Sequence, residues 1–201
     1  MKHLIKLIVL AQILVGAPAL AHTGGHHGGV SERIAFHDFM EGLQHPFGGM
    51  DHLLAIIAVG VICVPARKAH LGLNMSLLAG FAAVLALGFG VSSEGQNLAI
   101  EWVQFSFIVL FGMLILFHRY VPNWVSYIVV ITFAFMHGQM MPEVATSFAI
   151  GLWLATTILM VTIAEIYRTT LTKLSMSSRA QLAKHLGQGF LVSAALIVWV
   201  Q

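Results

Sequence analysis

Charged residues are scarce in this chain: they make up 9% of its 201 residues, whereas hydrophobic residues make up 58%. This number of charged residues is too small to cover the surface of a soluble protein of this size. The composition therefore indicates an integral membrane protein. The formal net charge of +2 gives no reason to expect nucleic acid as a partner. The sequence also has no P-loop, which argues against direct ATP hydrolysis by this chain.

Cysteine is nearly absent, because Cys63 is the only one. A single cysteine can form neither an intramolecular disulfide nor a Cys-rich zinc site. Any metal site must therefore use histidine, carboxylate, backbone oxygen or the sulfur of the 10 methionines. No organic cofactor is expected.

What is present begins with the pattern of a signal peptide. Two lysines precede an apolar run over residues 7–14, and Ala19 and Ala21 are the small residues that signal peptidase accepts. We predict cleavage after Ala21, so that residues 1–21 are removed and the mature chain starts at His22. The alternative is a first membrane anchor, for which roughly 15 apolar residues are short.

Residues 22–44 are predicted to form a periplasmic segment in two parts. The first part is rich in glycine and histidine, and its His22, His26 and His27 either bind metal or belong to a solvated linker. After Ser31, apolar residues recur on one helical face, which predicts a short interfacial helix whose polar residues are solvated.

Residues 45–201 contain six apolar stretches, each near the length that the hydrocarbon core requires. They are 46–64, 72–91, 100–118, 124–141, 144–166 and 186–200. The polar residues 168–184 read as a loop between the last two. The predicted fold is therefore all-α, a polytopic membrane bundle of six transmembrane helices after a cleaved signal peptide.

Basic residues predict the orientation of this bundle. With the mature N-terminus outside, the first, third and fifth loops are cytoplasmic, and only Arg33 lies outside. Those loops hold Arg67, Lys68, Arg119, Arg168, Lys173, Arg179 and Lys184. This asymmetry follows the positive-inside rule and agrees with the signal peptide. Both mature termini are then periplasmic, in a multi-pass protein of the cell inner membrane.

Several metal-binding residue types enter the apolar stretches. An ionisable side chain there costs free energy unless it faces a cavity or a partner, so it is a functional hypothesis by default. In the alternating topology, five of these side chains reach one level near the periplasmic side. They are His45, His52, Glu101, His137 and Glu143.

The motif over residues 45–52 has its own geometry. In a continuous helix, a separation of seven residues places His45 and His52 on one face, with His52 roughly 10 Å deeper. Asp51 lies about a quarter turn away, where it is either a ligand or the orienting partner of a histidine on a neighbouring span. Farther along, Glu165 is either an exit or proton-relay group or a residue facing the headgroups.

The motif His45-Pro46-x-x-Gly49-x-Asp51-His52 resembles the HupE/UreJ family of nickel permeases, and the resemblance covers nearly the whole mature chain. Glu101 and Gly112 reproduce a further pattern of that family, a glutamate eleven residues ahead of a glycine in the third span. His137-Gly138 and Glu143 match another motif loosely, because residues 139–142 replace its second histidine. Methionine sulfur at that place would favour a softer ion.

The resemblance implies nickel as the substrate, cobalt in some members, and an association with hydrogenase or urease maturation. Our interpretation is a secondary permease that imports a divalent transition metal. Zinc and copper are further candidate substrates, because the types of ligand present do not distinguish well among these ions. His22, His26 and His27 would raise the local metal concentration. Whether the protein forms a homo-oligomer is left open.

Two interpretations of other classes remain. In the first, zinc bound by His45, His52 and His137 activates water in an intramembrane hydrolase. In the second, the protein binds or hands over metal in the lipid bilayer without transporting it. Metal uptake into proteoliposomes distinguishes transport from both.

Overall fold

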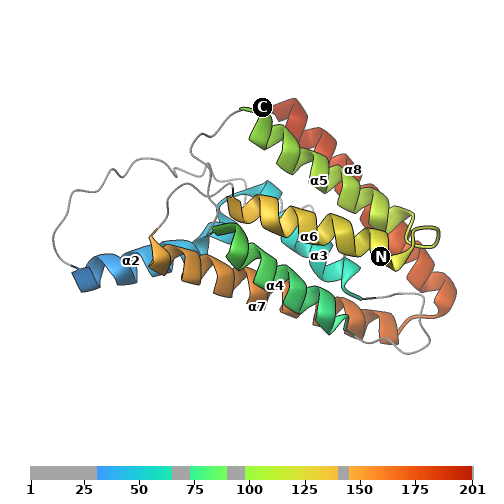
Figure 1. Cartoon of the computed structure of the whole chain (residues 1–201). Coiled ribbons are helices and arrows are strands. Elements are labelled where there is room, and N and C mark those ends of the chain that lie inside the picture. Colours follow the sequence, from blue (N-terminus) through green and yellow to red (C-terminus); the bar gives the residue numbers. More distant parts are fainter. Residues whose placement is uncertain (1–30, 65–72, 90–97, 140–144, 201) are drawn as a thin grey trace.

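The computed structural model describes residues 31–64, 73–89, 98–139 and 145–200. In these ranges the chain is helical and has no strand, so the all-α prediction is confirmed (Figure 1). The elements are α2 (Ser31–Gln44), η1 (His45–Phe47), α3 (Met50–Ile62), α4 (Met75–Phe89), α5 (Leu98–Leu116), α6 (Asn123–Gln139), α7 (Thr146–Thr172) and α8 (Met176–Val200). The predicted signal peptide and the segment 22–30 lie outside the described residues.

Helices α3 to α8 occur at all six positions where the sequence predicts spans. The predicted loop over residues 168–184 is wrong, because α7 continues to Thr172 and α8 begins at Met176. Polarity marks where a helix leaves hydrocarbon, but it does not end the helix when no proline or glycine interrupts the chain. The break is at Ser175, whose Oγ accepts a hydrogen bond from the backbone N–H of Ser178 at 3.2 Å and so caps α8.

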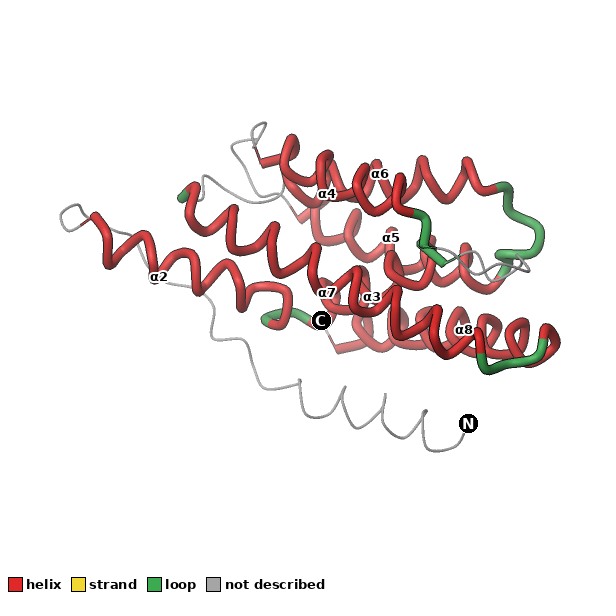
Figure 2. The backbone as a smooth tube through the Cα atoms, turned by 90° about the horizontal axis from the view of Figure 1, so that it is seen from below, coloured by secondary structure: helices red, strands yellow, loops and turns green. Residues whose placement is uncertain are grey.

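Glycines bring the helices together in pairs. A Cβ atom added at Gly42 of α2 would overlap the carbonyl oxygen of Phe148 in α7, and one at Gly138 of α6 would lie 2.6 Å from that of Leu85 in α4. A Cβ at Gly187 of α8 would lie 2.6 Å from a backbone nitrogen of α5. Such close backbone approach through small residues is typical of packing between membrane helices. Figure 2 shows the helices of these pairs side by side.

The same contacts give the directions of the paired helices. Gly80 approaches Ile131 and Gly88 approaches Gly138, so α4 and α6 run parallel. In α5 and α8 the order is reversed: Gly112 meets Leu191, whereas Leu116 meets Gly187, so these helices are antiparallel.

Helices α3 and α7 are parallel, because the ring of His45, just before α3, meets Phe148 near the start of α7 and Gly60 meets Met160 farther along both helices. Six spans that alternate in direction require these same relations: the first and fifth parallel, the second and fourth parallel, and the third and sixth antiparallel.

Fewer helices are long and apolar enough to cross a membrane than the number of predicted spans. Among the described residues, α7 alone is long and apolar enough to cross a membrane by itself. Residues 34–47 and 50–62 meet the same test together, as two helices bent by 74°, and α4 and residues 105–116 are apolar but shorter. The number of six spans stays a prediction.

The surface of the bundle is apolar along the helices. Large hydrophobic side chains are exposed on α4, α6, α7 and α8, among them Leu87, Ile128, Ile158 and Val192. Exposed apolar area of this extent marks a surface that meets a partner or lipid. Exposed aromatic residues mark the two ends of the bundle, as in the aromatic belts of membrane proteins. Trp102 and Trp199 lie at one end, and Tyr120 and Trp124 lie at the other.

Candidate metal centre

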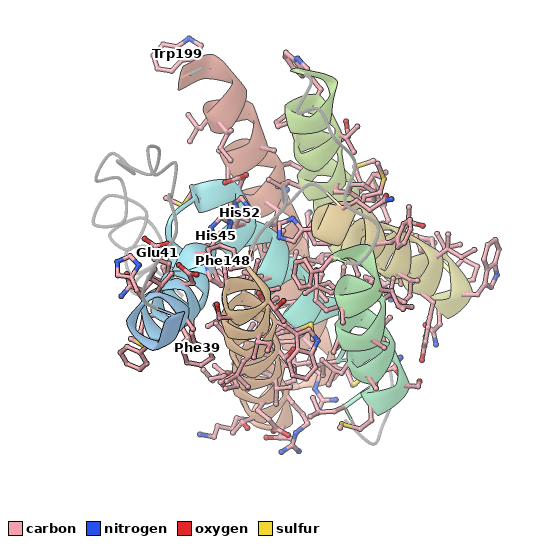
Figure 3. All side chains as sticks on the ribbon, turned by 60° about the vertical axis from the view of Figure 1, so that its left-hand side comes forward. Phe39, Glu41, His45, His52, Phe148 and Trp199 are labelled. Carbon is pink, nitrogen blue, oxygen red and sulfur yellow. The ribbon has the colours of Figure 1, made fainter. Side chains whose placement is uncertain are left out.

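Three histidines from different elements meet at one end of the bundle. His45 comes from η1, His52 from the first turn of α3 and His137 from the last turn of α6. The ring centroids of His45 and His52 are 5.0 Å apart, and those of His52 and His137 are 4.9 Å apart. Figure 3 shows His45 and His52 next to each other. We call these rings together with Asp51 the histidine cluster, and the end of the bundle that holds it the histidine end.

The route by which His45 reaches His52 differs from the prediction of a continuous helix. Residues 45–47 form a 3-10 turn, α3 starts only at Met50, and the two helices around this break meet at 74°. Pro46 lacks a backbone N–H, and Gly49 has an extended backbone, with φ −137° and ψ 137°. The rings are therefore neighbours because the chain bends, and the predicted depth difference of roughly 10 Å, which assumed an unbroken helix, is wrong.

Asp51 orients the histidine that follows it in sequence. Its Oδ1 lies 3.1 Å from Nδ1 of His52. A hydrogen on Nδ1 leaves the lone pair on Nε2, and this Nε2 is buried and has no hydrogen-bond partner in the described structure. A carboxylate that fixes one imidazole nitrogen and leaves the other for a metal is a common arrangement around bound metals. Asp51 thus orients a histidine of its own helical turn through this bond.

Aromatic rings cover two of the histidines of this cluster. The ring of Phe148 in α7 lies 5.4 Å from that of His45 (Figure 3), and the ring of Phe133 stacks on His137 at 5.2 Å. His137 itself is only 5% exposed. A cation that reaches His137 must therefore exchange water ligands for protein ligands.

A glycine makes room for the bond between Asp51 and His52. A Cβ added at Gly49 would lie 2.5 Å from Oδ1 of Asp51 and 2.9 Å from Nδ1 of His52. Those are the two atoms that bond to each other, so Gly49 is part of the cluster although it supplies no ligand.

The other predicted ligands are placed in part. The backbone of Glu101 lies in the first turn of α5, beside the exposed Trp102. Helices α5 and α6 are joined by the turn 117–122, so the start of α5 and the end of α6, with His137, lie at the same end of the bundle. Glu143 lies outside the described residues, as do His22, His26 and His27.

Glu165 belongs to the opposite end. Its Oε2 accepts a hydrogen bond from Nε of Arg168 at 2.7 Å, and its side chain is 42% exposed. Of the two roles predicted for Glu165, this pairing favours the one at the headgroup level.

One group of metal-binding side chains was not predicted. His37, Asp38 and Glu41 on α2 each offer a ligand atom, and these atoms all lie within 4.8 Å of one another. Nδ1 of His37 is 3.6 Å from Oε1 of Glu41. The side chains of His37 and Glu41 are exposed, which agrees with the predicted solvated face. The spacing of three and four residues along one helix was the available signal for their proximity.

Comparison with known proteins decides the family. The family model described as HupE / UreJ protein matches residues 10–197. The chain belongs to the HupE/UreJ family. Protein HupE of Rhizobium leguminosarum bv. viciae is similar to it, with 29% identity over 168 residues, which cover 79% of this chain and 81% of that protein. No solved structure gives a significant match.

Membership of the HupE/UreJ family suggests a membrane protein related to nickel and cobalt transport. The histidine cluster lies within the matched residues. Its donor types, imidazole and carboxylate, suit nickel and cobalt as well as zinc and copper(II).

Proposed function

We propose that the protein is a secondary permease that imports a divalent transition metal, nickel first among the candidates, across the cell inner membrane. The histidine cluster is its periplasmic capture site. One observation carries this proposal: three imidazole rings and a carboxylate, brought from η1, α3 and α6, meet at one end of a bundle whose sides are apolar.

The charge distribution supports the assignment of the histidine end to the periplasm. Helix directions place the turn 117–122, the end of α7 and the start of α8 at the opposite end of the bundle. Basic residues gather there, as the positive-inside rule requires of a cytoplasmic face. They are Arg119, Arg168, Lys173, Arg179 and Lys184. The same orientation leaves both mature termini in the periplasm.

The cluster suits capture of a hydrated cation. Neutral imidazoles replace water ligands, and the carboxylate of Asp51 supplies negative charge close to the positive N-terminal end of α3. Glu101 and Glu143 would add carboxylates at the same level. His22, His26 and His27 would raise the metal concentration in front of the cluster after cleavage at Ala21. The cation is the substrate, the chain needs no organic cofactor, and the imported nickel would serve hydrogenase or urease maturation.

Uptake into proteoliposomes tests this function. The purified protein is reconstituted into liposomes that enclose a metal-sensitive dye. Nickel, cobalt, zinc and copper are then added outside the liposomes in parallel experiments. We expect protein-dependent uptake of nickel, which His52→Ala abolishes and which His185→Ala leaves unchanged, because His185 is exposed on α8 far from the cluster. Absence of uptake for all four metals would overturn the proposal. Hydrolysis of lipid substrates by the same preparation would instead indicate the zinc enzyme.

A further inference from the structure

Two hydroxyl groups are buried in the middle of α7. The Oγ1 atoms of Thr156 and Thr157 are shielded from solvent and have no hydrogen-bond partner in the described structure. Thr156 is only 1% exposed. A buried hydroxyl without a partner costs free energy, so native proteins seldom keep one without a use.

Other threonines of α7 show that the helix itself can satisfy such groups. Thr162, Thr169 and Thr170 each donate a hydrogen bond to the carbonyl oxygen four residues earlier, at 2.8, 2.7 and 2.8 Å. This local bond is the usual one for threonine in a helix. Thr156 and Thr157 do not make it, so their hydroxyls remain available to something else in the interior.

Thr156 also interrupts a row of small and apolar side chains. The buried face of α7 consists of Gly151, Leu152, Thr156, Met160, Ala164, Tyr167 and Leu171. Thr156 and Ile163 are seven residues apart, almost two helical turns, and share one helical face. The side chain of Ile163 and the carbonyl oxygen of Met160 both lie at Gly60 of α3. Thr156 therefore faces the interior that α7 shares with α3.

The depth of Thr156 places it beyond the histidine cluster. His52 lies eight residues before Gly60 in α3, which is roughly 12 Å of helix rise toward the histidine end, and Thr156 lies four residues before Met160 in α7, roughly 6 Å. Because α3 and α7 run parallel and Gly60 meets Met160, Thr156 is about one helical turn deeper than His52. An ion that leaves the cluster for the opposite end reaches the level of Thr156 next.

We propose that Thr156, together with Thr157, forms an inner polar station that holds a partly hydrated divalent cation after it leaves the histidine cluster. This inference rests on the proposed function. The hydroxyl oxygens would accept hydrogen bonds from the water molecules of the ion, or bind the ion directly. Neutral hydroxyls hold a divalent cation more weakly than imidazole and carboxylate do. Weak binding is what an intermediate station needs, since the ion must enter it and leave it again.

Substitutions that remove or keep the hydroxyl test the station. In the proteoliposome assay with nickel, Thr156→Val keeps the shape of the side chain and removes the hydroxyl, whereas Thr156→Ser keeps the hydroxyl. Thr162→Val is the matched control, because Thr162 lies on the same helix but is exposed and donates to its own helix.

We expect Thr156→Val to lower the maximal uptake rate about ten-fold, the size of effect that follows the loss of a hydrogen bond to a charged group. The half-saturating nickel concentration should stay unchanged, because the histidine cluster still captures the ion. Thr156→Ser and Thr162→Val should transport within about two-fold of the unmodified protein. If Thr156→Val does not assemble, Thr156→Ala removes the same hydroxyl in a smaller side chain and is read in the same way.

The possible outcomes distinguish failure of the polar station from failure of the proposed permease function. A normal maximal rate for Thr156→Val, together with loss of uptake in His52→Ala, would overturn the station and leave the permease intact. An equal loss in Thr162→Val would also overturn it, because the effect would then lie in the helix and not in the buried hydroxyl. No uptake by the unmodified protein would overturn the permease and the station together.

Discussion

At the scale of single residues, His52 is the centre of the histidine cluster. Its ring contacts both other histidine rings, and its Nδ1 bonds to Asp51. The cluster therefore depends on His52 for contact and on Asp51 for orientation. Removal of His52 takes away the ring that contacts both other histidines, and removal of Asp51 leaves His52 without the bond that orients it.

Asp51→Asn and His52→Ala are expected to abolish metal uptake while the protein still inserts and folds. Asp51→Asn preserves size and some hydrogen bonding but deletes the charge that offsets a divalent cation. Losing an orienting partner of this kind typically lowers metal affinity about 10- to 100-fold, and losing a direct ligand lowers it at least as much. Nickel binding by calorimetry and uptake in proteoliposomes measure both effects.

Normal transport by well-expressed Asp51→Asn and His52→Ala proteins would show that the cluster is structural packing. A matched exposed histidine, His185, provides the control for loss of an imidazole as such.

Gly49→Ala is expected to weaken nickel binding although alanine adds only a methyl group. The new Cβ would lie 2.5 Å from Asp51 Oδ1, so the carboxylate must turn away from His52. The expected loss of affinity is about ten-fold, as for other changes in the groups that orient a metal ligand. Gly189→Ala is the control, because a Cβ at Gly189 meets nothing within 4 Å. Unchanged affinity in Gly49→Ala would mean that the bond between Asp51 and His52 does not matter for the metal.

At the scale of elements, the position of His137 depends on how α6 packs on α4. Gly138 follows His137 directly, and a Cβ there would lie 2.8 Å from Cα of Gly88 in α4. The two backbones touch at this point, so the pair of glycines sets how far His137 stands from His52. The hydrogen bond from Trp153 Nε1 of α7 to the carbonyl oxygen of Ala82, at 2.7 Å, joins α4 to a third helix.

Gly138→Ala is expected to lower the stability of the folded protein by roughly 1–3 kcal/mol, the usual cost of overfilling a packed interior. It should also weaken nickel binding, because separation of α4 and α6 moves His137. Thermal unfolding in detergent and nickel titration measure the two effects. Gly80→Ala, on the same helix pair, meets only the flexible tip of Ile131 at 3.1 Å, so it should change stability much less. Equal effects at Gly80 and Gly138 would contradict a special role for the contact beside His137.

At the scale of the whole molecule, the bundle has two chemically different ends and apolar sides. One end holds the histidine cluster and the other holds the described basic residues of the turns between helices. The aromatic residues Trp102 and Trp199 lie toward the first end, and Tyr120 and Trp124 toward the second. This difference between the ends is what the proposed orientation requires, with the histidine end in the periplasm and the basic end in the cytoplasm.

A reporter fused after Gln201 is expected to behave as periplasmic, because six crossings return the chain to the side on which the mature chain starts. Activity of a fused alkaline phosphatase, compared with a fused green fluorescent protein, measures the side. A second fusion within the turn 117–122 should report the cytoplasm. A cytoplasmic C-terminus would show that one span is miscounted, with 186–200 the first to be re-examined.

The helical fold and the residues of the candidate site could be predicted from the sequence, because both predictions depend on local composition. Apolar stretches of bilayer length predicted helices at six positions, and the structure has helices at these positions. Asp51 and His52 were predicted to be site residues because charged and metal-binding groups are costly inside an apolar stretch, and the structure brings their side chains into contact. The motif over residues 45–52 also indicated the family that the family model then showed.

Other features depend on contacts between distant parts of the chain, so only the tertiary structure decided them. Local periodicity predicted an unbroken helix from His45, whereas packing of α2 on α7 and the extended backbone of Gly49 bend the chain there. Whether a buried hydroxyl such as that of Thr156 has a partner also depends on all its neighbours at once. The sequence by itself determined which residues enter the apolar interior, because transfer from water is a property of each side chain. The tertiary structure decided which of them meet, because that depends on how close the glycines let the helix backbones approach.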